Sequence, residues 1–469
     1  MSVVHRHARV TLFLPLFAFG CSGAEREQSP ITHRTDGSIE LFDGRIVPPL
    51  PKLAGVREQF ELRLTWLAAK HEGLLPMMRK HTIAMWIVTS EEFHPDPVTQ
   101  YVAPDLEYTA RLTFHVFVDA GAEGLKRYSN YSRPTADYAR FFESLPVPRS
   151  ARGRQDAAQG LRLLFERYDP ETIGLNMGGV RGQDRGLTRD AYAFLVDALG
   201  PNAQARFVSA AALIEDYFDT RLPDELEHYR ALVLVTDILA QRALSNEVIT
   251  PGVTRAGDVK WWFNQQIASL GVGAEPWFEI HTAVQRFDPT SGRVIPYVHP
   301  APDSLVYQRG DIIHLDCGLN YLGFASDWQK VAYVLREGET DVSEGMKVAL
   351  RNANLMHEAF ASAPRPGMTG REATLAIMRQ LESVDFLPSL YSHPLGYQGH
   401  ALGAGLNARN MVVAGYERDT RLRLGSYRSV EFSAKTALEE WNGDSLLVPM
   451  EDDAFLTELG YEYFRPYQT

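Results

Sequence analysis

The 469-residue sequence predicts two domains, an α/β domain followed by an α+β domain that contains two similar halves. Apolar, strand-like runs alternate with helical segments up to about residue 219, a pattern typical of an α/β layer. A new long helix begins at Pro223 and opens the first of two similar helix pairs. At roughly 150 residues per domain, the chain has room for both units.

Composition and charge narrow the class of protein. The sequence is 45% hydrophobic and 23% charged, which is typical of an ordinary globular chain with real hydrophobic cores. Its formal net charge of −12 at pH 7 argues against nucleic acid or an anionic membrane surface as a partner.

Residues 1–24 are predicted to form a signal peptide. Arg6 and Arg9 precede an apolar run at 10–19, which is about half of the ~20 residues that span a bilayer. Small residues follow, and the surroundings of Cys21 resemble a bacterial lipoprotein cleavage site. We therefore expect an exported protein of the bacterial periplasm or cell envelope, either lipid-anchored at Cys21 or released by cleavage near Ala24.

Residues 25–54 are expected to be a leader or linker, with the polar stretch at 25–36 as a tether. Cys317 is the only other cysteine, so no intrachain disulfide is expected once Cys21 is lipidated or removed. Alternation along a strand points Cys317 inward, as a small buried hydrophobic residue without a catalytic role.

The first domain, residues 55–219, shows a mixed pattern of helices and strands. Thr188 is expected to cap a helix that ends at Gly200. The glycine-rich segment 176–186 lacks the lysine of a phosphate-binding loop and is predicted to be a plain surface loop. The other predicted elements are a helix at 56–70 and strands at 83–89, 111–118 and 172–175.

The second domain, residues 220–469, contains an internal repeat. The segments PGVT at 251–254 and PGMT at 366–369 each open a helix that follows a longer one, which predicts two pseudo-symmetric halves. A site in such a domain is expected between the halves. The predicted helices cover 224–244, 251–271, 341–361 and 366–384.

Residues 310–333 are predicted to form a β-hairpin. If its turn is centred between Tyr321 and Leu322, Asp316 lies directly opposite Asp327. Like charges in that position are destabilising, and a metal cation between them would compensate. The alternative is a pair of exposed strand carboxylates in a slightly shifted register.

Further candidate ligands follow downstream. His393 and His400 lie in a turn-rich segment, and histidines with this spacing are also common as structural or exposed residues. Glu431 and Glu451 lie within apolar strands that a turn at 442–443 can join as a second hairpin. Four carboxylates and one imidazole favour Mn²⁺ or another divalent ion, and their charge suits two ions.

The ordered set Asp316, Asp327, His393, Glu431 and Glu451 resembles the five metal ligands of the pita-bread metallopeptidases (M24), the family of methionine aminopeptidase, aminopeptidase P and prolidase. The similarity includes His299, eleven residues before Gly310, and it spans about residues 55–465. The segment DPETIGLN at 169–176 is similar to the creatinase-like amino-terminal domain. The two-domain layout favours the aminopeptidase P and prolidase branch.

This resemblance implies a creatinase-like domain at 55–219 and a pita-bread catalytic domain at 220–469. It implies a Xaa-Pro aminopeptidase that cleaves peptides with a hydroxide shared by two divalent ions, with Mn²⁺ expected first and Co²⁺ or Zn²⁺ as alternatives. A prolidase-like dipeptidase, a hydrolase of a non-peptide amide or ester, and a metal-free binding homologue remain open alternatives. A homodimer is a further expectation.

The resemblance also implies a role for each residue. Asp327 and Glu451 would contact both ions, Asp316 one ion, and His393 and Glu431 the other. Glu431 would exchange protons with the nucleophile and the leaving amine, while His299 and His400 would orient substrate and stabilise the oxyanion. The sequence departs from the family at Gln329, where threonine is common, and at Pro449, where arginine is common. The sequence therefore does not decide how strictly the substrate must contain proline.

Overall fold

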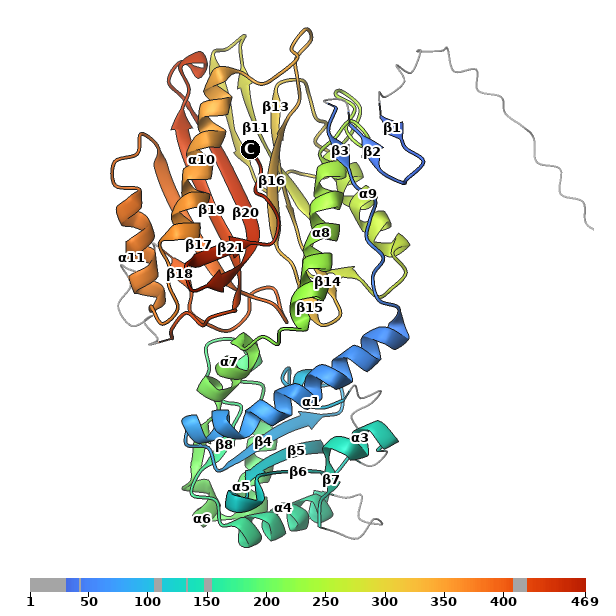
Figure 1. Cartoon of the computed structure of the whole chain (residues 1–469), viewed down its shortest axis with the longest axis vertical. Helices are drawn as coiled ribbons and strands as arrows, with labels where there is room; N and C mark the ends of the chain where they lie inside the picture. The colour runs from blue at the N-terminus through green and yellow to red at the C-terminus, as the bar shows by residue number, and fades with distance from the viewer. Residues whose placement is uncertain (1–30, 42–43, 105–111, 132–133, 147–153, 408–419) are drawn as a thin grey trace, which may run out of the picture.

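The computed structural model describes residues 31–41, 44–104, 112–131, 134–146, 154–407 and 420–469 (Figure 1). The predicted signal peptide, with Cys21, lies outside these residues. The chain forms two lobes, one around a six-stranded sheet and the other around a nine-stranded sheet (Figure 1). No helix in the described segments is long and apolar enough to cross a membrane.

A small three-stranded sheet precedes both lobes, although the sequence suggests a leader in this region. It consists of β1 (Thr32–His33), β2 (Ile39–Glu40) and β3 (Ile46–Val47). Ile39 and Val47 are buried in a cluster with Ile238 of α8 (Glu225–Ala243), a helix of the carboxy-terminal lobe. This apolar contact attaches the segment to the second domain.

The amino-terminal lobe is an α/β layer whose sheet has the order β7-β6-β5-β4-β8-β9. Alternate residues of β4 enter two cores. Trp86 and Val88 face the core that includes α1 and α7, whereas Met85 and Ile87 face the core under α4 and α5. The elements are α1 (Val56–Lys80), β4 (Met85–Glu91), α2 (Thr99–Val102), β5 (Leu112–Asp119), β6 (Leu125–Ser129), α3 (Ala136–Phe141), β7 (Glu143–Ser144), α4 (Arg154–Tyr168), β8 (Ile173–Leu175), α5 (Arg189–Leu199), α6 (Pro201–Gln204), β9 (Phe207–Ser209) and α7 (Ala211–Asp219).

The structure confirms the three strands predicted in this lobe as β4, β5 and β8. It also confirms Thr188 as the cap of α5, where its hydroxyl accepts a hydrogen bond from the amide of Ala191. Helix α1 runs past its predicted end at residue 70 to Lys80, because Leu74 and Met78 continue its buried face.

The carboxy-terminal lobe is built on a sheet of order β12-β11-β13-β16-β20-β19-β17-β18, with β21 paired to β20. The two predicted helix pairs are α8 with α9 and α10 with α11. Besides α8, its elements are α9 (Ala256–Ser269), β10 (Glu275–Pro276), β11 (His281–Asp288), β12 (Arg293–Val298), β13 (Asp311–Cys317), β14 (Leu319–Tyr321), β15 (Phe324–Ala325), β16 (Trp328–Tyr333), α10 (Glu344–Ser362), α11 (Gly370–Gln380), β17 (Leu387–Leu395), β18 (Leu406–Asn407), β19 (Tyr427–Ala437), β20 (Ser445–Thr457) and β21 (Gly460–Tyr463).

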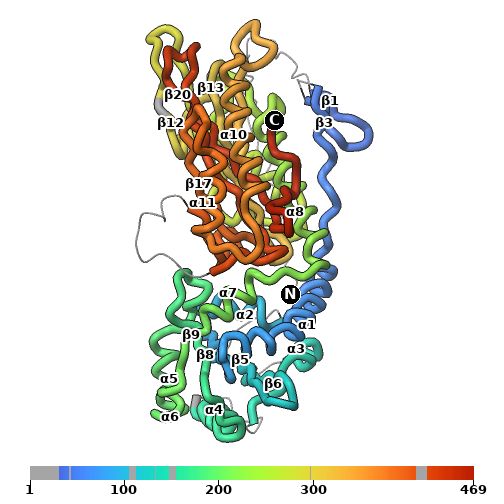
Figure 2. Tube along the Cα trace, turned by 60° about the vertical axis from the view of Figure 1, so that its left-hand side comes forward, coloured from blue at the N-terminus to red at the C-terminus, as the bar shows by residue number. Residues whose placement is uncertain are grey.

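The long helices cover one face of this sheet. Helix α8 packs on β13, β14 and β16, and α10 packs on β19, β20 and β21. Helices α10 and α11 lie side by side on the same side of the strands in both views (Figures 1 and 2). The opposite face of the sheet is therefore the one left for a site.

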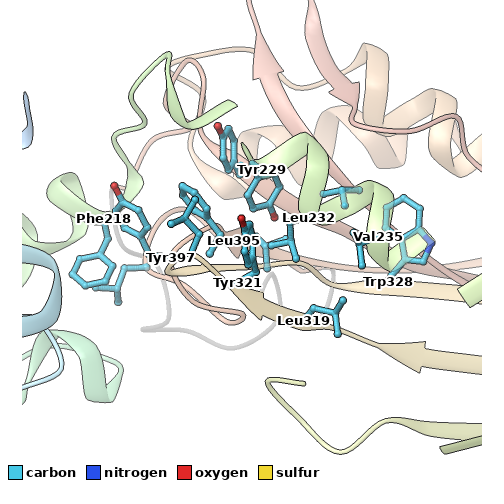
Figure 3. Close-up of a cluster of buried hydrophobic side chains, with 14 of the residues drawn as sticks. Phe218, Tyr229, Leu232, Val235, Leu319, Tyr321, Trp328, Leu395 and Tyr397 are labelled. Carbon is cyan, nitrogen blue, oxygen red and sulfur yellow. The ribbon is translucent and has the colours of Figure 1, made fainter. Parts of the chain in front are cut away.

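An aromatic cluster joins the two lobes. Tyr397, in the loop after β17, stacks on Tyr101 with ring centroids 5.0 Å apart and on Phe324 at 5.5 Å. Phe218 of α7 packs edge-on against Tyr397 at 6.1 Å, and Figure 3 shows these rings continuing toward Tyr321. Because residues of both lobes belong to one buried core, this loop has a fixed position between them.

The predicted register of the hairpin at 310–333 is wrong. Asp316 lies opposite Gln329, and the turn is formed by Leu322 and Gly323, with φ values of 56° and 82°. Two positive φ angles are typical of a two-residue type I′ turn. The shift moves the pairing by two residues, so Asp327 keeps the same face and becomes a diagonal neighbour of Asp316.

Gly318 lies where the hairpin divides between the main sheet and β14. A Cβ atom at this position would lie 2.0 Å from Nε1 of Trp277 and 2.5 Å from the carbonyl oxygen of Ser326. These two groups are hydrogen-bonded to each other at 2.8 Å.

We expect Gly318→Ala to break this hydrogen bond and to destabilise the protein by about 1–3 kcal/mol, the usual cost of overpacking. Thermal unfolding should report a lower Tm. Gly55→Ala is the matched control, because a Cβ at Gly55 meets no heavy atom within 4 Å. Equal Tm values for the two variants would contradict this account of the hairpin.

Candidate active site

One row of polar side chains crosses the centre of the large sheet. Each member lies directly opposite the next on the neighbouring strand, and cross-strand partners share a face. The row consists of His281 on β11, Asp316 on β13, Gln329 on β16, Glu451 on β20, Glu431 on β19 and Tyr391 on β17. The predicted pairing of Glu431 with Glu451 in a second hairpin is confirmed.

Alternation along the strands explains why the row faces away from the helices. Leu315 and Cys317 flank Asp316 and are buried in the core that contains α8. Val430 and Phe432 flank Glu431 and are buried in the core under α10. The apolar pattern of the strands thus fixes the direction of the carboxylates, and Cys317 is buried as predicted.

Asp327 and His393 complete the group. Nε2 of His393 lies 3.5 Å from Oδ2 of Asp327, 3.8 Å from Oε1 of Glu451 and 3.9 Å from Oε2 of Glu431. Asp316, Asp327 and Glu451 offer a second set of oxygen atoms that lie within 4.8 Å of one another. The structure therefore brings all five predicted ligands together.

The electrostatics of this group are unfavourable without a cation. Burial and then the charge of Glu451 raise the pKa of Asp316 and of Asp327 well above the usual range of a carboxyl. The same two causes raise the pKa of Glu431 to about 9. Charged carboxylates in such a place need a compensating partner.

Two buried atoms in the group lack a hydrogen-bond partner among the described residues. They are Oδ1 of Asp316 and Nε2 of His393. Unpartnered buried polar atoms are rare, and here they belong to a set of carboxylate oxygens and one imidazole nitrogen. This donor set fits divalent cations that prefer oxygen ligands.

Gln329 orients Glu451 through a chain of hydrogen bonds. Its amide nitrogen donates to Oε2 of Glu451 at 2.7 Å, and its amide oxygen accepts from Nε2 of His314 at 2.9 Å. Nδ1 of His314 then accepts from the hydroxyl of Tyr297 at 2.7 Å. Burial lowers the pKa of His314 to about 3, so this ring stays neutral, with one nitrogen as donor and the other as acceptor in this series of hydrogen bonds.

Asp453 holds the backbone of Asp327 in place through hydrogen bonds. Both oxygens of the buried Asp453 carboxylate accept hydrogen bonds from the amide of Asp327, at 3.2 and 3.3 Å. The hydroxyl of Tyr229 donates to the same carboxylate at 3.3 Å. Sequence reasoning missed this residue, although a second buried acid two positions after Glu451 is a signal that could have found it.

His281 is the other residue that sequence reasoning missed. Its Nε2 lies 3.4 Å from Oδ2 of Asp316 and 2.9 Å from Nε2 of His299. Burial and the neighbouring His281 lower the pKa of His299. Only the pairing of β11 with β13 brings His281 to the site, and that pairing is not local in sequence.

His400 lies on the opposite side of the group from His299. Its ring packs edge-on against His393, with centroids 4.3 Å apart, and against Trp277 at 5.4 Å. Burial, and then the neighbouring His393, lower the pKa of His400 to about 4. His400 is therefore a neutral imidazole at physiological pH, able to donate one hydrogen bond.

Residues 227–458 match the family model described as metallopeptidase family M24. A search of curated proteins finds no match. Among solved structures, the fold is similar to an X-Pro aminopeptidase from Thermotoga maritima MSB8, with a TM-score of 0.58 and 16% identity over 84% of this chain and 99% of that one.

Two further structures show the same likeness. A Xaa-Pro dipeptidase from Bacillus anthracis has a TM-score of 0.58 and 18% identity over 86% of this chain and 99% of that one. Aminopeptidase P from Escherichia coli has a TM-score of 0.57 and 16% identity over 87% of this chain and 94% of that one. The chain is therefore a metallopeptidase of family M24 with the pita-bread fold and the two-domain architecture of aminopeptidase P and prolidase.

Proposed function

We propose that this metallopeptidase is a Xaa-Pro aminopeptidase, which removes the amino-terminal residue from peptides with proline in the second position. The observation that carries the proposal is the convergence of five ligands on one face of the sheet, with two of their atoms buried and unpartnered. Similar structures described as X-Pro aminopeptidase and Xaa-Pro dipeptidase support this substrate class.

Five side chains would hold two divalent ions, with Mn²⁺ expected first. Asp327 and Glu451 lie centrally and would contact both ions, Asp316 would bind one, and His393 and Glu431 the other. Bound ions of this kind act as Lewis acids that polarise a carbonyl group and lower the pKa of water.

Glu431 is the residue best suited to carry a proton during the reaction. Its side chain is 26% exposed, more than those of His393 and Glu451, so it can reach the substrate side. It could take the proton of the nucleophile and pass it to the leaving amine.

The histidines at the two ends of the site would bind the substrate. Neutral His400 can donate its N–H to the oxygen on which negative charge develops in the transition state. His299 is hydrogen-bonded to His281, which would hold its ring in place to orient the substrate. The backbone carbonyl of Glu279 accepts from Nδ1 of His281 at 2.9 Å and thereby fixes that second ring.

A prolidase-like dipeptidase is the second candidate, because one similar structure is described as a Xaa-Pro dipeptidase. Both functions would use the same ligands. Rates on a Xaa-Pro dipeptide and on a longer Xaa-Pro peptide distinguish them, since an aminopeptidase cleaves the longer peptide at least as well.

The Mn²⁺-loaded protein should release the first residue of Xaa-Pro peptides, and Asp327→Asn should lower kcat/KM by more than about 100-fold. Even outer partners of metal ligands contribute about 10–100-fold, and Asp327 is placed among the ligands themselves. Amino-acid release is followed by mass spectrometry, with circular dichroism to verify folding.

Asp341→Asn serves as the control, because this carboxylate is exposed and pairs with Lys347 far from the row. The proposal fails if the wild-type protein cleaves no proline-containing peptide, or if both variants lose activity equally.

Metal binding should become stronger as pH rises. Without metal, the folded state holds a proton on Glu431 between the ordinary pKa of 4.5 and the raised value of about 9, whereas the unfolded state has released it. In the metal-free protein, the contribution of Glu431 to stability is therefore fully present below pH ~4.5 and is lost as pH rises toward ~9. Metal replaces the proton, so metal binding should strengthen over the same range.

The measurement is Tm of chelator-treated protein with and without Mn²⁺ at about pH 6 and about pH 8. We expect the increase in Tm on adding metal to be larger at the higher pH, and Glu431→Gln to reduce that difference. An increase that is the same at both pH values in the wild-type protein would contradict this assignment.

A further inference from the structure

A groove between the two lobes begins at His400. It has a volume of about 910 Å³, and residues of both lobes line it. The lining side chains used below are Arg63, Arg181 and Gln183 of the amino-terminal lobe and Trp277, Tyr397 and His400 of the carboxy-terminal lobe. A peptide that extends beyond the metal ligands on the His400 side would enter this groove.

The glycine-rich segment 176–186 forms one wall and is not the plain surface loop predicted from the sequence. The buried carboxylate of Asp184 accepts hydrogen bonds from the amides of Val180 at 3.1 Å and Arg181 at 2.9 Å. A Cβ at Gly179 would lie 2.0 Å from the Asp184 carboxyl group, so only glycine fits. The backbone at Arg181 is therefore held in one position.

The same segment contacts the catalytic lobe. The side-chain amide of Gln183 donates to the backbone carbonyl of His400 at 3.3 Å. At the base of the segment, Asn176 donates to Asp96 at 2.9 Å and accepts from the indole of Trp86 at 2.8 Å. The amino-terminal lobe thus presents Arg181 to the site from a rigid support.

The guanidinium of Arg181 reaches the edge of the candidate metal site. It lines the same groove as His400, and its positive charge also acts on Tyr391, which lies directly opposite Glu431 on the sheet. It also contributes to lowering the pKa of His400, whose ring packs on His393. Arg181 therefore lies in the part of the groove whose neighbouring residues, Tyr391 and His400, adjoin Glu431 and His393.

The charge of Arg181 is available to a ligand. Within the parts of the chain that the structure describes, no carboxylate forms an ion pair with this guanidinium. The charged residues that line the groove are Arg63, Arg181 and Glu275, so positive charge predominates. A guanidinium in a partly desolvated groove pairs well with a planar carboxylate.

We propose that Arg181 binds the terminal carboxylate of a short peptide substrate, and that the amino-terminal lobe thereby sets a preference for peptide length. This inference rests on the proposed function. Each residue adds at most ~3.3–3.6 Å to an extended chain. Because Arg181 lines the groove together with His400, only a short peptide would place its terminal carboxylate at this guanidinium.

The test compares Xaa-Pro-Yaa peptides with a free carboxylate and with an amidated end, in the Mn²⁺-loaded full chain. Wild-type protein should have a lower KM for the free acid. Arg181→Met should raise KM for the acid by about tenfold, the effect of a lost charge-assisted hydrogen bond, and leave KM for the amide unchanged. Arg181→Lys should restore part of the difference.

Arg185→Met is the matched control, an exposed arginine of the same segment outside the groove lining. Equal changes in KM for the acid and the amide, or no change for either, would overturn the inference. Arg181 would then have only a structural role. If wild-type protein cleaves neither peptide, the proposed function is wrong, and the inference is judged from calorimetric binding of the same peptides. The preference for the acid must then be present in the wild-type protein and absent from Arg181→Met.

Discussion

Repulsion among carboxylates on one face of a sheet is the constraint on which the rest of this structure depends. Asp316, Asp327, Glu431 and Glu451 converge with His393, and burial makes their charges costly. Apolar side chains in place of buried charges are often as stable or more stable, so the cations that this group would bind explain the arrangement. The cores under α8 and α10 compensate by fixing the strands from the opposite face.

Around this group, hydrogen-bonded partners keep the ligands oriented. Gln329 and the neutral His314 direct Glu451, and Tyr229 with Asp453 holds the backbone at Asp327. The aromatic contact of Tyr397 with Tyr101 brings the amino-terminal lobe against the same region. The amino-terminal lobe therefore supplies one wall of the groove that starts at His400.

The sequence was informative where structure is local. Asn442 and Gly443 adopt positive φ angles at the turn, and the long strands on either side are paired so that Glu431 meets Glu451. The register at Asp316 was mispredicted because Leu322 adopts a positive φ, which is unusual for a leucine, and because Gly318 divides the hairpin.

Non-local contacts could not be predicted from the sequence. His281 meets Asp316 only through the pairing of β11 with β13, and Gln183 contacts His400 from a different lobe. The measurement that tests the central claim most directly is a titration of the metal-free protein with Mn²⁺, followed by electron paramagnetic resonance. The account predicts saturation at two ions per chain with a spectrum of magnetically coupled ions. Saturation at one ion with the spectrum of isolated Mn²⁺, or no binding, would contradict it.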